Sequence, residues 1–475
     1  MLSCTSNAAP AWAACLCHRP EIHALTRRLG TDLSRRGFVA GAAASMMLPK
    51  LAAAQAPPAR VVFANVRLFD GKADRLRDGL RVLVEGNRIK AVAEGNPAAP
   101  DGARVIDCGG RVLMPGLIDA HWHALFAALP LPVVLTAEAS YIQLAASAEA
   151  GRTLMRGFTT VRDLGGPAFA LKQAIDEGLV AGPRLYPSGA MITSSGGHGD
   201  LRPLSDLPSD GKPSLTERTG GGMIVDSPDA VRMRVREQLL QGASQIKVVG
   251  SGGVSSPRSP LDVASFTEPE LRAAVEAAAD WSTYVTVHAY TPLTIARAIA
   301  AGAACIEHGH LMDEATARLM ADKGTWLSIQ PFLTTDDAAP MTGESQIKMR
   351  QVFAGTDRAY TLARDHKVKM AFGSDLLFSQ ALMRRQGTML THLSRWFTSS
   401  EILKMATAAN GELLALSGPR NPYPGKLGVV EDGALADLLL VDGDPLTDIK
   451  LLEAPEKNLL VIMKDGKIHK DALKG

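Results

Sequence analysis

Residues 117–123 read Leu-Ile-Asp-Ala-His-Trp-His, a short and mostly apolar stretch that ends in two histidines. The stretch predicts a β-strand, in which successive side chains point to opposite faces. His121 and His123 therefore lie on the same face of the expected strand. The pair alone is weak evidence for a functional site, because histidines on strands are common. Whether the pair belongs to a functional site depends on which residues end the other strands.

Seven further segments have the same apolar character and alternate with helix-like stretches. One helix is expected to begin at Thr267, because Thr-Glu-Pro-Glu at 267–270 is a capping box with proline in the first turn. Eight strands with intervening helices predict an α/β fold, a (β/α)8 TIM barrel over residues 113–417, with its chemistry at the carboxyl ends of the strands. The expected strands are 117–123, 159–163, 184–188, 245–249, 284–288, 305–308, 326–330 and 369–375.

Both flanks of this central segment have a different pattern. Residues 61–112 contain short strands separated by glycine turns, with a hairpin turn at 85–88, and residues 436–468 repeat this pattern. Neither flank is long enough to form a stable domain alone. We therefore expect residues 57–112 and 418–475 to form one small β-sandwich domain that draws on both ends of the chain.

The first 56 residues are expected to be a cleaved signal region. Arg35 and Arg36 precede Gly-Phe and an uncharged run of about 13 residues, and Ala-Gln-Ala at 54–56 offers a cleavage site. This arrangement resembles a twin-arginine (Tat) signal, which serves proteins exported already folded. A bilayer span needs about 20 residues, so we expect no stable membrane anchor. Cleavage near Ala56 predicts a periplasmic or secreted protein.

The composition is that of a globular protein. Of the 475 residues, 46% are hydrophobic and 21% are charged, which excludes a disordered chain or a coiled coil. The 51 basic and 49 acidic residues nearly cancel, so we expect no nucleic-acid partner. Once the signal region is removed, only Cys108 and Cys305 remain, too few for a disulfide framework.

Polar residues on other strands support a functional site that includes the two histidines. Lys247 interrupts an apolar fourth strand. His288 and His308 end the fifth and sixth strands, and Asp375 ends the eighth. Each could singly be a buried histidine, a salt-bridged lysine or a helix cap, but together they would need six unrelated explanations for one rim. Imidazole and carboxylate suit zinc, with nickel, manganese and iron left open.

Lys247 indicates how many metal ions the site holds. An ammonium group buried beside divalent cations is electrostatically unfavourable, and burial favours the neutral amine. A neutral amine can add carbon dioxide and become a carbamate, whose two oxygens can bridge metals about 3.5–4 Å apart. We therefore expect two divalent metal ions, N6-carboxylation of Lys247, and a bound hydroxide that is available as nucleophile near neutral pH.

With these residues the sequence resembles the amidohydrolase superfamily, in particular its branch of Xaa-Pro dipeptidases and imidazolonepropionase-like enzymes. The resemblance covers nearly the whole mature chain and implies a metal-dependent barrel with a β-sandwich built from both chain ends. The motifs that carry it are Met-Pro-Gly-Leu-Ile-Asp-Ala-His-Trp-His at 114–123, Thr-Thr-Val-Arg-Asp at 159–163, Gly-Gly-His-Gly at 196–199, Ile-Lys at 246–247, Val-His-Ala at 287–289, Ile-Glu-His-Gly at 306–309 and Gly-Ser-Asp at 373–375.

The resemblance also implies a set of roles for these residues. Asp375 is expected to take the proton of the attacking hydroxide and pass it to the leaving nitrogen. His198, in the glycine-rich loop after the third strand, is expected to polarise the substrate carbonyl. Apart from the resemblance, Tyr290 and Arg258 are candidates for holding a substrate carboxylate because they lie near the ends of the fifth and fourth strands, with a solvated surface arginine as the alternative for Arg258. The ligands implied for one metal are His121, His123, Lys247 and Asp375, and those for the other are Lys247, His288 and His308.

Within this branch the resemblance implies a small-molecule substrate, a dipeptide or an N-acyl amino acid, from which a C-terminal amino acid is released. Some relatives cleave the aryl amide of ochratoxin A, and the apolar residues 125–127 fit an aromatic or aliphatic group. We also expect a homo-oligomer. The alternatives are a cyclic-amide hydrolase such as an imidazolonepropionase, a mononuclear deaminase, which needs no bridging Lys247, and a non-enzymatic scaffold, which would not keep costly buried polar groups.

Overall fold

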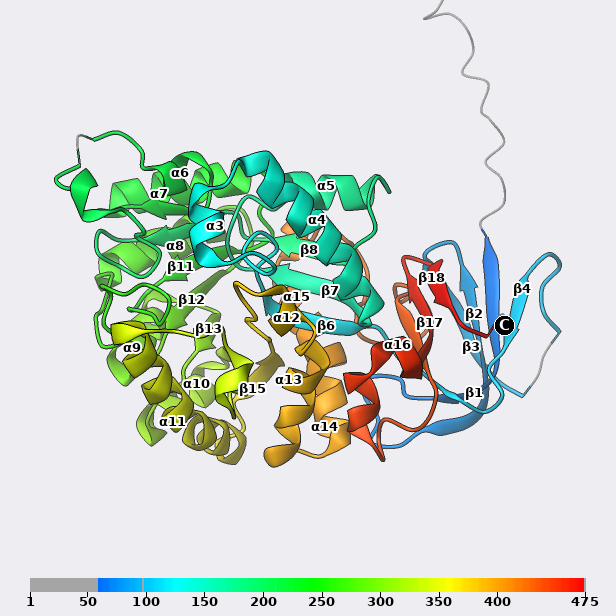
Figure 1. Cartoon of the computed structure of the whole chain (residues 1–475). Helices are drawn as coiled ribbons and strands as arrows, with labels where there is room; N and C mark the ends of the chain where they lie inside the picture. The colour runs from blue at the N-terminus through cyan, green and yellow to red at the C-terminus, as the bar shows by residue number, and fades with distance from the viewer. Residues whose placement is uncertain (1–58, 96–97, 210, 474–475) are drawn as a thin grey trace, which may run out of the picture. The chain divides into compact units, whose positions relative to one another are not determined.

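The structure, a computed structural model, describes residues 59–95, 98–209 and 211–473. The signal region expected over residues 1–56 lies outside the described residues. Among the helices that the structure describes, none is both long and apolar enough to span a bilayer. The described chain contains a central segment of parallel strands and helices and a second sheet built from its two ends (Figure 1).

All eight strands expected in the central segment are present, and they pair in parallel within their sheets (Figure 1). Seven of the eight are buried along their whole length, as expected for parallel strands that are covered on both faces. The strands are β6 (Leu117–Trp122), β7 (Phe158–Asp163), β8 (Arg184–Pro187), β11 (Ile246–Val249), β12 (Val285–Ala289), β13 (Cys305–His308), β14 (Trp326–Ile329) and β15 (Lys369–Phe372).

Hydrogen bonds divide these strands between two sheets. One sheet has the order β6-β7-β8, and the other has the order β10-β9-β11-β12-β13-β14-β15. The second sheet contains two strands that the sequence did not predict, β9 (Met191–Thr193) and β10 (Gly222–Ile224). Both are only three residues long, which is too short to show the alternation or the apolar run that identifies a strand.

Two side-chain amides connect these sheets. Asn410 Nδ2 donates to the carbonyl oxygens of Ile118 in β6 and Phe372 in β15, at 2.7 and 2.8 Å. Gln245, which precedes β11, donates from Nε2 to the carbonyl oxygen of Tyr186 in β8 at 2.9 Å. Buried backbone groups at a sheet edge need such partners. Asn410 therefore joins the edge strands β6 and β15, and Gln245 joins the edge strand β8 to the residue that precedes β11.

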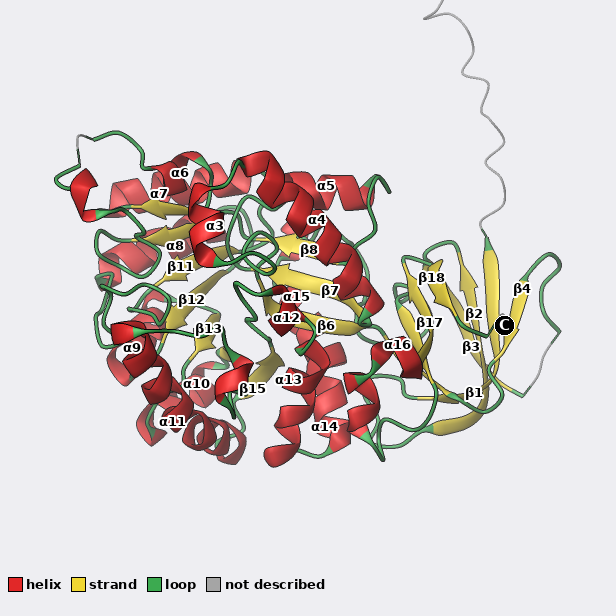
Figure 2. Cartoon of the chain, in the orientation of Figure 1, coloured by secondary structure: helices red, strands yellow, loops and turns green. Residues whose placement is uncertain are grey.

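Helices surround the strands of the central segment (Figure 2). The expected capping box is present: Glu270 accepts from the backbone N–H and the hydroxyl of Thr267, at 2.8 and 2.7 Å. The helices of this segment are α3 (Leu131–Thr136), α4 (Ala139–Met155), α5 (Phe169–Asp176), α6 (Leu215–Arg218), α7 (Pro228–Leu240), α8 (Glu268–Ala279), α9 (Pro292–Ala301), α10 (Glu314–Lys323), α11 (Gly343–Asp365), α12 (Gln380–Met383), α13 (Gln386–His392), α14 (Ser399–Lys404) and α15 (Asn410–Ala415).

Strands from both ends of the described chain form a second, eight-stranded sheet in the order β18-β17-β16-β5-β1-β2-β3, with β4 paired to β1. A two-sheet sandwich was expected, whereas hydrogen bonds join these strands in one sheet, and apolar residues from both ends pack into one core. The expected hairpin turn is confirmed by pairing of Glu85 with Arg88. Strand β5 continues past the expected boundary at residue 112.

The elements of this second sheet are short. Its eight strands come in two runs, one at each end of the described chain, and a one-turn helix precedes β17. They are β1 (Arg60–Leu68), β2 (Arg77–Glu85), β3 (Arg88–Glu94), β4 (Arg104–Asp107), β5 (Val112–Pro115), β16 (Leu438–Val441), α16 (Pro455–Asn458), β17 (Leu459–Lys464) and β18 (Lys467–Asp471).

Candidate metal centre

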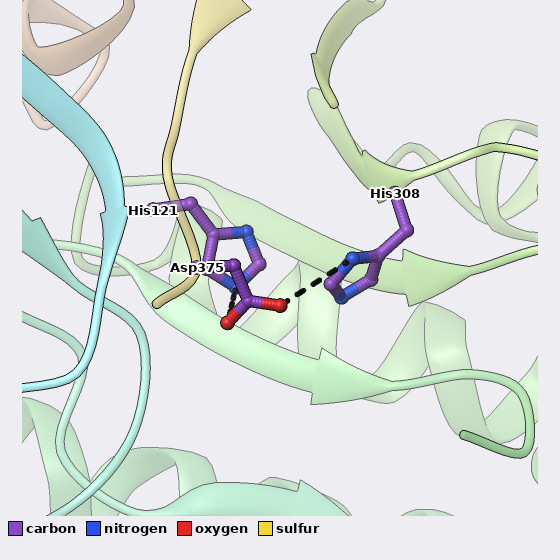
Figure 3. A group of neighbouring side chains, drawn as sticks. All are labelled: His121, His308 and Asp375. Carbon is purple, nitrogen blue, oxygen red and sulfur yellow. Dashed lines mark ion pairs between the residues drawn. The ribbon is translucent and has the colours of Figure 1, made fainter. Parts of the chain in front are cut away.

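Three side chains converge at the carboxyl ends of the central strands (Figure 3). His121 belongs to β6, His308 ends β13, and Asp375 follows β15. One ligand atom from each lies within 4.8 Å of the other two. Oδ1 of Asp375 is 3.4 Å from Nε2 of His121, and Oδ2 is 3.9 Å from Nδ1 of His308. The strand order thus brings together residues that are far apart in sequence.

The other expected ligands line the same cavity. His123 Nε2 lies 3.4 Å from Oδ1 of Asp375. The ring centroid of His288 is 4.3 Å from that of His308, and Lys247 of β11 also lines the cavity. The cavity has a volume of about 1700 Å³, its open mouth included. The structure therefore brings all six expected ligands to one place.

The backbone is left-handed at two of these positions. The φ angle is 77° at His308 and 47° at Asp375. A non-glycine residue adopts this region at a cost of about 1–3 kcal/mol, and such strain collects at functional sites. The turn also explains why β15 ends at Phe372 although a strand reaching residue 375 was expected. It directs Asp375 toward β6, where its N–H donates to the carbonyl oxygen of His121 at 2.8 Å.

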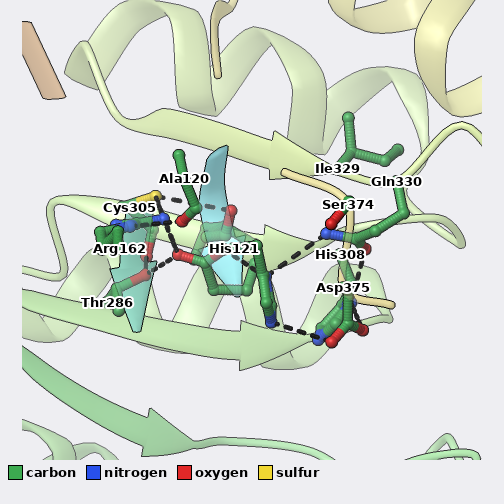
Figure 4. A network of polar contacts seen from close by, with 12 residues as sticks. Ala120, His121, Arg162, Thr286, Cys305, His308, Ile329, Gln330, Ser374 and Asp375 are labelled. Carbon is green, nitrogen blue, oxygen red and sulfur yellow. Dashed lines mark hydrogen bonds and ion pairs between the residues drawn. The ribbon is translucent and has the colours of Figure 1, made fainter. Parts of the chain in front are cut away.

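A buried ionic network orients His121 from the side away from Asp375 (Figure 4). Glu307 accepts from Nδ1 of His121 at 2.8 Å and from the guanidinium of Arg162 at 2.6 Å, and the Thr286 hydroxyl donates to the same carboxylate. Burial raises the pKa of Glu307, but Arg162 and His121 outweigh it and hold that pKa well below its usual range. An ionised carboxylate at Nδ1 fixes the tautomer that leaves Nε2 available to a metal.

Lys247 is a buried cation of the site. No hydrogen bond or ion pair joins its amine to another residue in the part of the chain that the structure describes. Burial lowers the pKa of Lys247 to about 8, although Glu307 and Asp375 oppose this effect. A substantial fraction of the amine is therefore neutral near pH 8, and the neutral form is the one that reacts with carbon dioxide.

Four imidazoles of the site, those of His121, His198, His288 and His308, are neutral near pH 7. Burial lowers the pKa of His121 to about 4 and that of His198 to about 3. Burial also holds the pKa values of His288 and His308 well below the ordinary value. For Asp375 burial raises the pKa, but the neighbouring histidines outweigh it, so that its pKa lies below the ordinary value. Neutral imidazoles and an ionised carboxylate are the forms that bind metals.

His198 lines the cavity from the loop that follows β9. Its Nδ1 lies 2.8 Å from Oγ of Ser256. The loop that carries Ser256 is held by the buried Lys348 of α11, whose Nζ donates to the carbonyl oxygens of Gly253, Ser256 and Ser259 at 2.7, 2.6 and 3.0 Å. Gly253 is required for this packing, because a Cβ there would lie 2.4 Å from the His198 ring.

The two candidates for a carboxylate site have different positions. Tyr290 is buried, lines the cavity and stacks on His308, with ring centroids 5.1 Å apart. Arg258 is exposed and is not among the residues that line the cavity, so the structure does not bring it together with Tyr290. Ser256 and Ser259 of the same loop are buried.

The sequence did not identify the residues that support the ligands. One sequence feature could have indicated Arg162 and Glu307. Both are charged residues inside otherwise apolar strands, where a charge is tolerated only when it is paired. Their contact joins positions 145 residues apart, which no local pattern predicts. No sequence feature indicated Gln330 or Lys348. Oε1 of Gln330 lies 2.7 Å from Nδ1 of His308.

The donor set fits a divalent metal. Imidazole nitrogens and a carboxylate are preferred ligands of zinc and of several transition metals. Oδ1 of Asp375 is buried and lacks a hydrogen-bond partner among the described residues, although Nε2 atoms of His121 and His123 both lie 3.4 Å away. Buried polar groups are rarely left in this state without an additional partner such as an ion.

Comparisons with known proteins agree with this chemistry. The sequence profile of the Amidohydrolase family matches residues 112–469. Ochratoxinase from Aspergillus niger is 31% identical over 382 residues, which are 76% of this chain and 76% of that protein. A solved amidohydrolase structure is 37% identical, with a TM-score of 0.81, over 87% of this chain and 100% of that one. A prolidase solved with N-methylphosphonate-L-proline is 35% identical over the same shares, with a TM-score of 0.80.

Proposed function

The chain belongs to the amidohydrolase family, and from this membership we propose that it hydrolyses the amide bond of a dipeptide or an N-acyl amino acid at a two-metal centre. Hydrolase chemistry is common to the family. The substrate proposal is supported by what the similar proteins are called, an ochratoxinase and a prolidase. Tyr290 is the residue of this chain proposed to contact the substrate carboxylate.

The observation that carries the proposal is the position of Lys247 among the buried histidines. A buried ammonium group without a partner is unfavourable, and a single metal held by the His121, His308 and Asp375 cluster would repel it. Conversion of Lys247 to a carbamate removes this conflict and adds two anionic oxygens. We propose that this carbamate is shared by two metals, one held also by His121, His123 and Asp375 and the other also by His288 and His308.

The fold supports the same proposal. We propose that strands β6 to β8 and β11 to β15 form a (β/α)8 barrel, which is supported by the contacts of Asn410 and Gln245 between the two sheets. The sheet formed by both chain ends is proposed as the second domain of the same architecture. In such barrels the carboxyl ends of the strands carry the chemistry, and this is where the candidate ligands lie.

Divalent ions bound here, with zinc as the proposed metal, would polarise the amide carbonyl and acidify an attacking water. The chain's own residues supply the rest. Asp375 is ionised and accepts a proton from the water at its carboxylate, then releases it to the leaving nitrogen. An amide nitrogen leaves poorly unless it is protonated, so this transfer is needed for bond cleavage.

His198 is proposed to stabilise the charge that develops on the carbonyl oxygen. Because Ser256 occupies Nδ1, Nε2 is the atom of His198 left to face the substrate. The pKa of His198, lowered by burial to about 3, keeps the ring neutral, so that it acts as a hydrogen-bond donor rather than as a cation. A fixed donor of this kind acts by electrostatic stabilisation of the transition state.

The alternatives make different demands on these residues. A mononuclear deaminase has no use for a buried Lys247, and a scaffold would not be expected to keep the strained backbone at His308 and Asp375. A cyclic-amide hydrolase uses the same metal chemistry and differs only in the substrate. Export through a twin-arginine signal and assembly as a homo-oligomer remain predictions.

A substrate screen on metal-replete protein tests the proposal. Dipeptides and N-acyl amino acids with varied C-terminal residues are expected to be hydrolysed, and Lys247→Ala is expected to abolish that activity and to regain part of it with a short carboxylic acid. Lys369→Ala serves as the control, because Lys369 is exposed at the start of β15. Undiminished activity of Lys247→Ala would contradict the shared carbamate. Hydrolysis of cyclic amides alone would favour the alternative.

A further inference from the structure

The cavity that contains the candidate ligands has a second region with a different chemical character. Its titratable lining residues, the histidines with Lys247, Tyr290 and Asp375, all lie at or next to the candidate metal centre. Beyond them the lining is almost entirely apolar and contains no charged side chain among the described residues. We call this outer region the antechamber. Its principal apolar residues are Phe126, Leu131, Val134, Leu135, Phe332, Met341, Val352 and Phe353.

One wall of the antechamber is the short helix α3. Its sequence is Leu-Pro-Val-Val-Leu-Thr, and none of its residues is buried. Leu131, Val134 and Leu135 are spaced so that they share one face of the helix, and these three line the cavity. Leaving apolar surface exposed to water costs about 25 cal/mol per Å². A helix with this sequence is therefore expected to cover an apolar partner.

A series of neighbouring rings leads from the candidate metal centre to Phe332 and Phe353 of the cavity lining. Tyr290 stacks on His308, and the ring centroids of Tyr290 and His310 are 5.9 Å apart. The ring of His310 stacks on Phe332, which stacks on Phe353, with centroid separations of 5.6 and 5.2 Å. The antechamber is thus continuous with the site at which an amide bond would be cleaved.

We infer that the antechamber binds one half of the amide substrate, and that this half is an uncharged group with a long aliphatic chain or several rings. The inference rests on the proposed function and specifies its substrate class. A carboxylate or ammonium group placed there would lose its hydration without gaining a charged partner, which is unfavourable. Each methylene group buried there is expected to raise affinity about fourfold.

Two matched series of amides test this inference on the metal-replete protein. The first varies the acyl group of an N-acyl amino acid from acetyl to hexanoyl to decanoyl, and the second varies the amine of an N-acetyl amide over the same lengths. In one series kcat/KM is expected to rise at least about tenfold from the shortest to the six-carbon member. In adipoyl a carboxylate replaces the terminal methyl group of hexanoyl. The adipoyl substrate is expected to show no such rise in kcat/KM. A flat response in both series would overturn the inference while leaving the proposed function intact.

A pair of variants on α3 connects the preference to the wall. Val134→Asp places a carboxylate in the antechamber and is expected to abolish the preference for the long chain. Val133→Asp is the matched control, because Val133 lies on the same helix, is also partly exposed and does not line the cavity. An unchanged preference in Val134→Asp, or an equal loss in both variants, would count against the inference.

Binding separates this inference from the proposed function. Titration calorimetry with decanamide and acetamide is expected to show tighter binding of decanamide to the wild type and to Val133→Asp, and a loss of at least about tenfold in Val134→Asp. If no amide is hydrolysed but decanamide binds in this pattern, the proposed function fails and the antechamber assignment stands. Equal binding of the two amides to the wild type contradicts the assignment.

Discussion

Nδ1 of His121 lies 2.8 Å from a carboxylate oxygen of Glu307, and both side chains are buried. The other carboxylate oxygen accepts from Arg162 at 2.6 Å. Glu307 thereby connects a candidate metal ligand to a structural ion pair inside the strands. Carboxylates in this position set both the tautomer and the basicity of a ligating histidine.

Glu307→Gln is therefore expected to weaken metal binding by about 10-fold to 100-fold and to destabilise the fold by about 3–5 kcal/mol, because Arg162 would be left buried without its partner. Glu149→Gln is the control, since Glu149 is buried and paired with Arg152 and Arg156. That variant should lose stability and keep its metal affinity. Equal metal affinities in the two variants, measured by competition with a chelating dye, would remove Glu307 from the site.

Lys348→Met is expected to lower kcat/KM by about 10-fold to 100-fold, because small displacements of a catalytic group are costly. Lys348 reaches no substrate; it positions the loop whose Ser256 contacts His198. Lys470→Met is the control, since Lys470 of β18 donates to two backbone carbonyls of α16. Steady-state kinetics measure this. We expect kcat/KM to be lower in Lys348→Met and unchanged in Lys470→Met.

Asp375→Asn is expected to keep the fold and to lose about 100-fold to 10,000-fold in turnover, the range associated with general acid–base catalysis. Circular dichroism checks the fold, and kcat on the best substrate checks the turnover. The exposed Asp365→Asn should behave as the wild type. Near-normal turnover in Asp375→Asn would mean that another group moves the proton.

We expect His310 to make the stability of the metal-free protein depend on pH. The side chain is buried and burial lowers its pKa to about 4, so the neutral ring stabilises the fold above pH 6.5 and this contribution is lost as the pH falls toward 4. His310→Phe should lose less stability over that interval than the wild type, by up to about 3 kcal/mol. Urea unfolding at several pH values measures this. His366→Phe, at a partly exposed position, is the control, and equal slopes in His310→Phe and the wild type would refute the assignment.

The strands of the central segment could be predicted because parallel strands are buried on both faces and appear as apolar runs that end in a polar residue. His121, His288 and His308 mark such ends, and they line the cavity. The three-residue strands β9 and β10 could not be predicted, because segments of that length show no periodicity. The length of β15 was overestimated, since the left-handed turn at Asp375 depends on tertiary contacts.

The candidate site was predictable only in part, for a related reason. Ligand residues carry their chemistry in their own side chains, whereas Glu307 and Lys348 act through partners that only the fold brings near. The exposure of Arg258 could not be predicted from its residue type either, because it depends on how the loop around Ser256 packs. A residue type in a loop therefore predicts chemistry less reliably than the same residue type at a strand end.

The central claim is that Lys247 helps to hold two metal ions. It is tested most directly by the metal content per chain of protein prepared with zinc and bicarbonate, measured by elemental analysis beside Lys247→Ala. The account predicts two ions per chain in the wild type and at most one in the variant. One ion or none in the wild type, or two ions retained by Lys247→Ala, would contradict it.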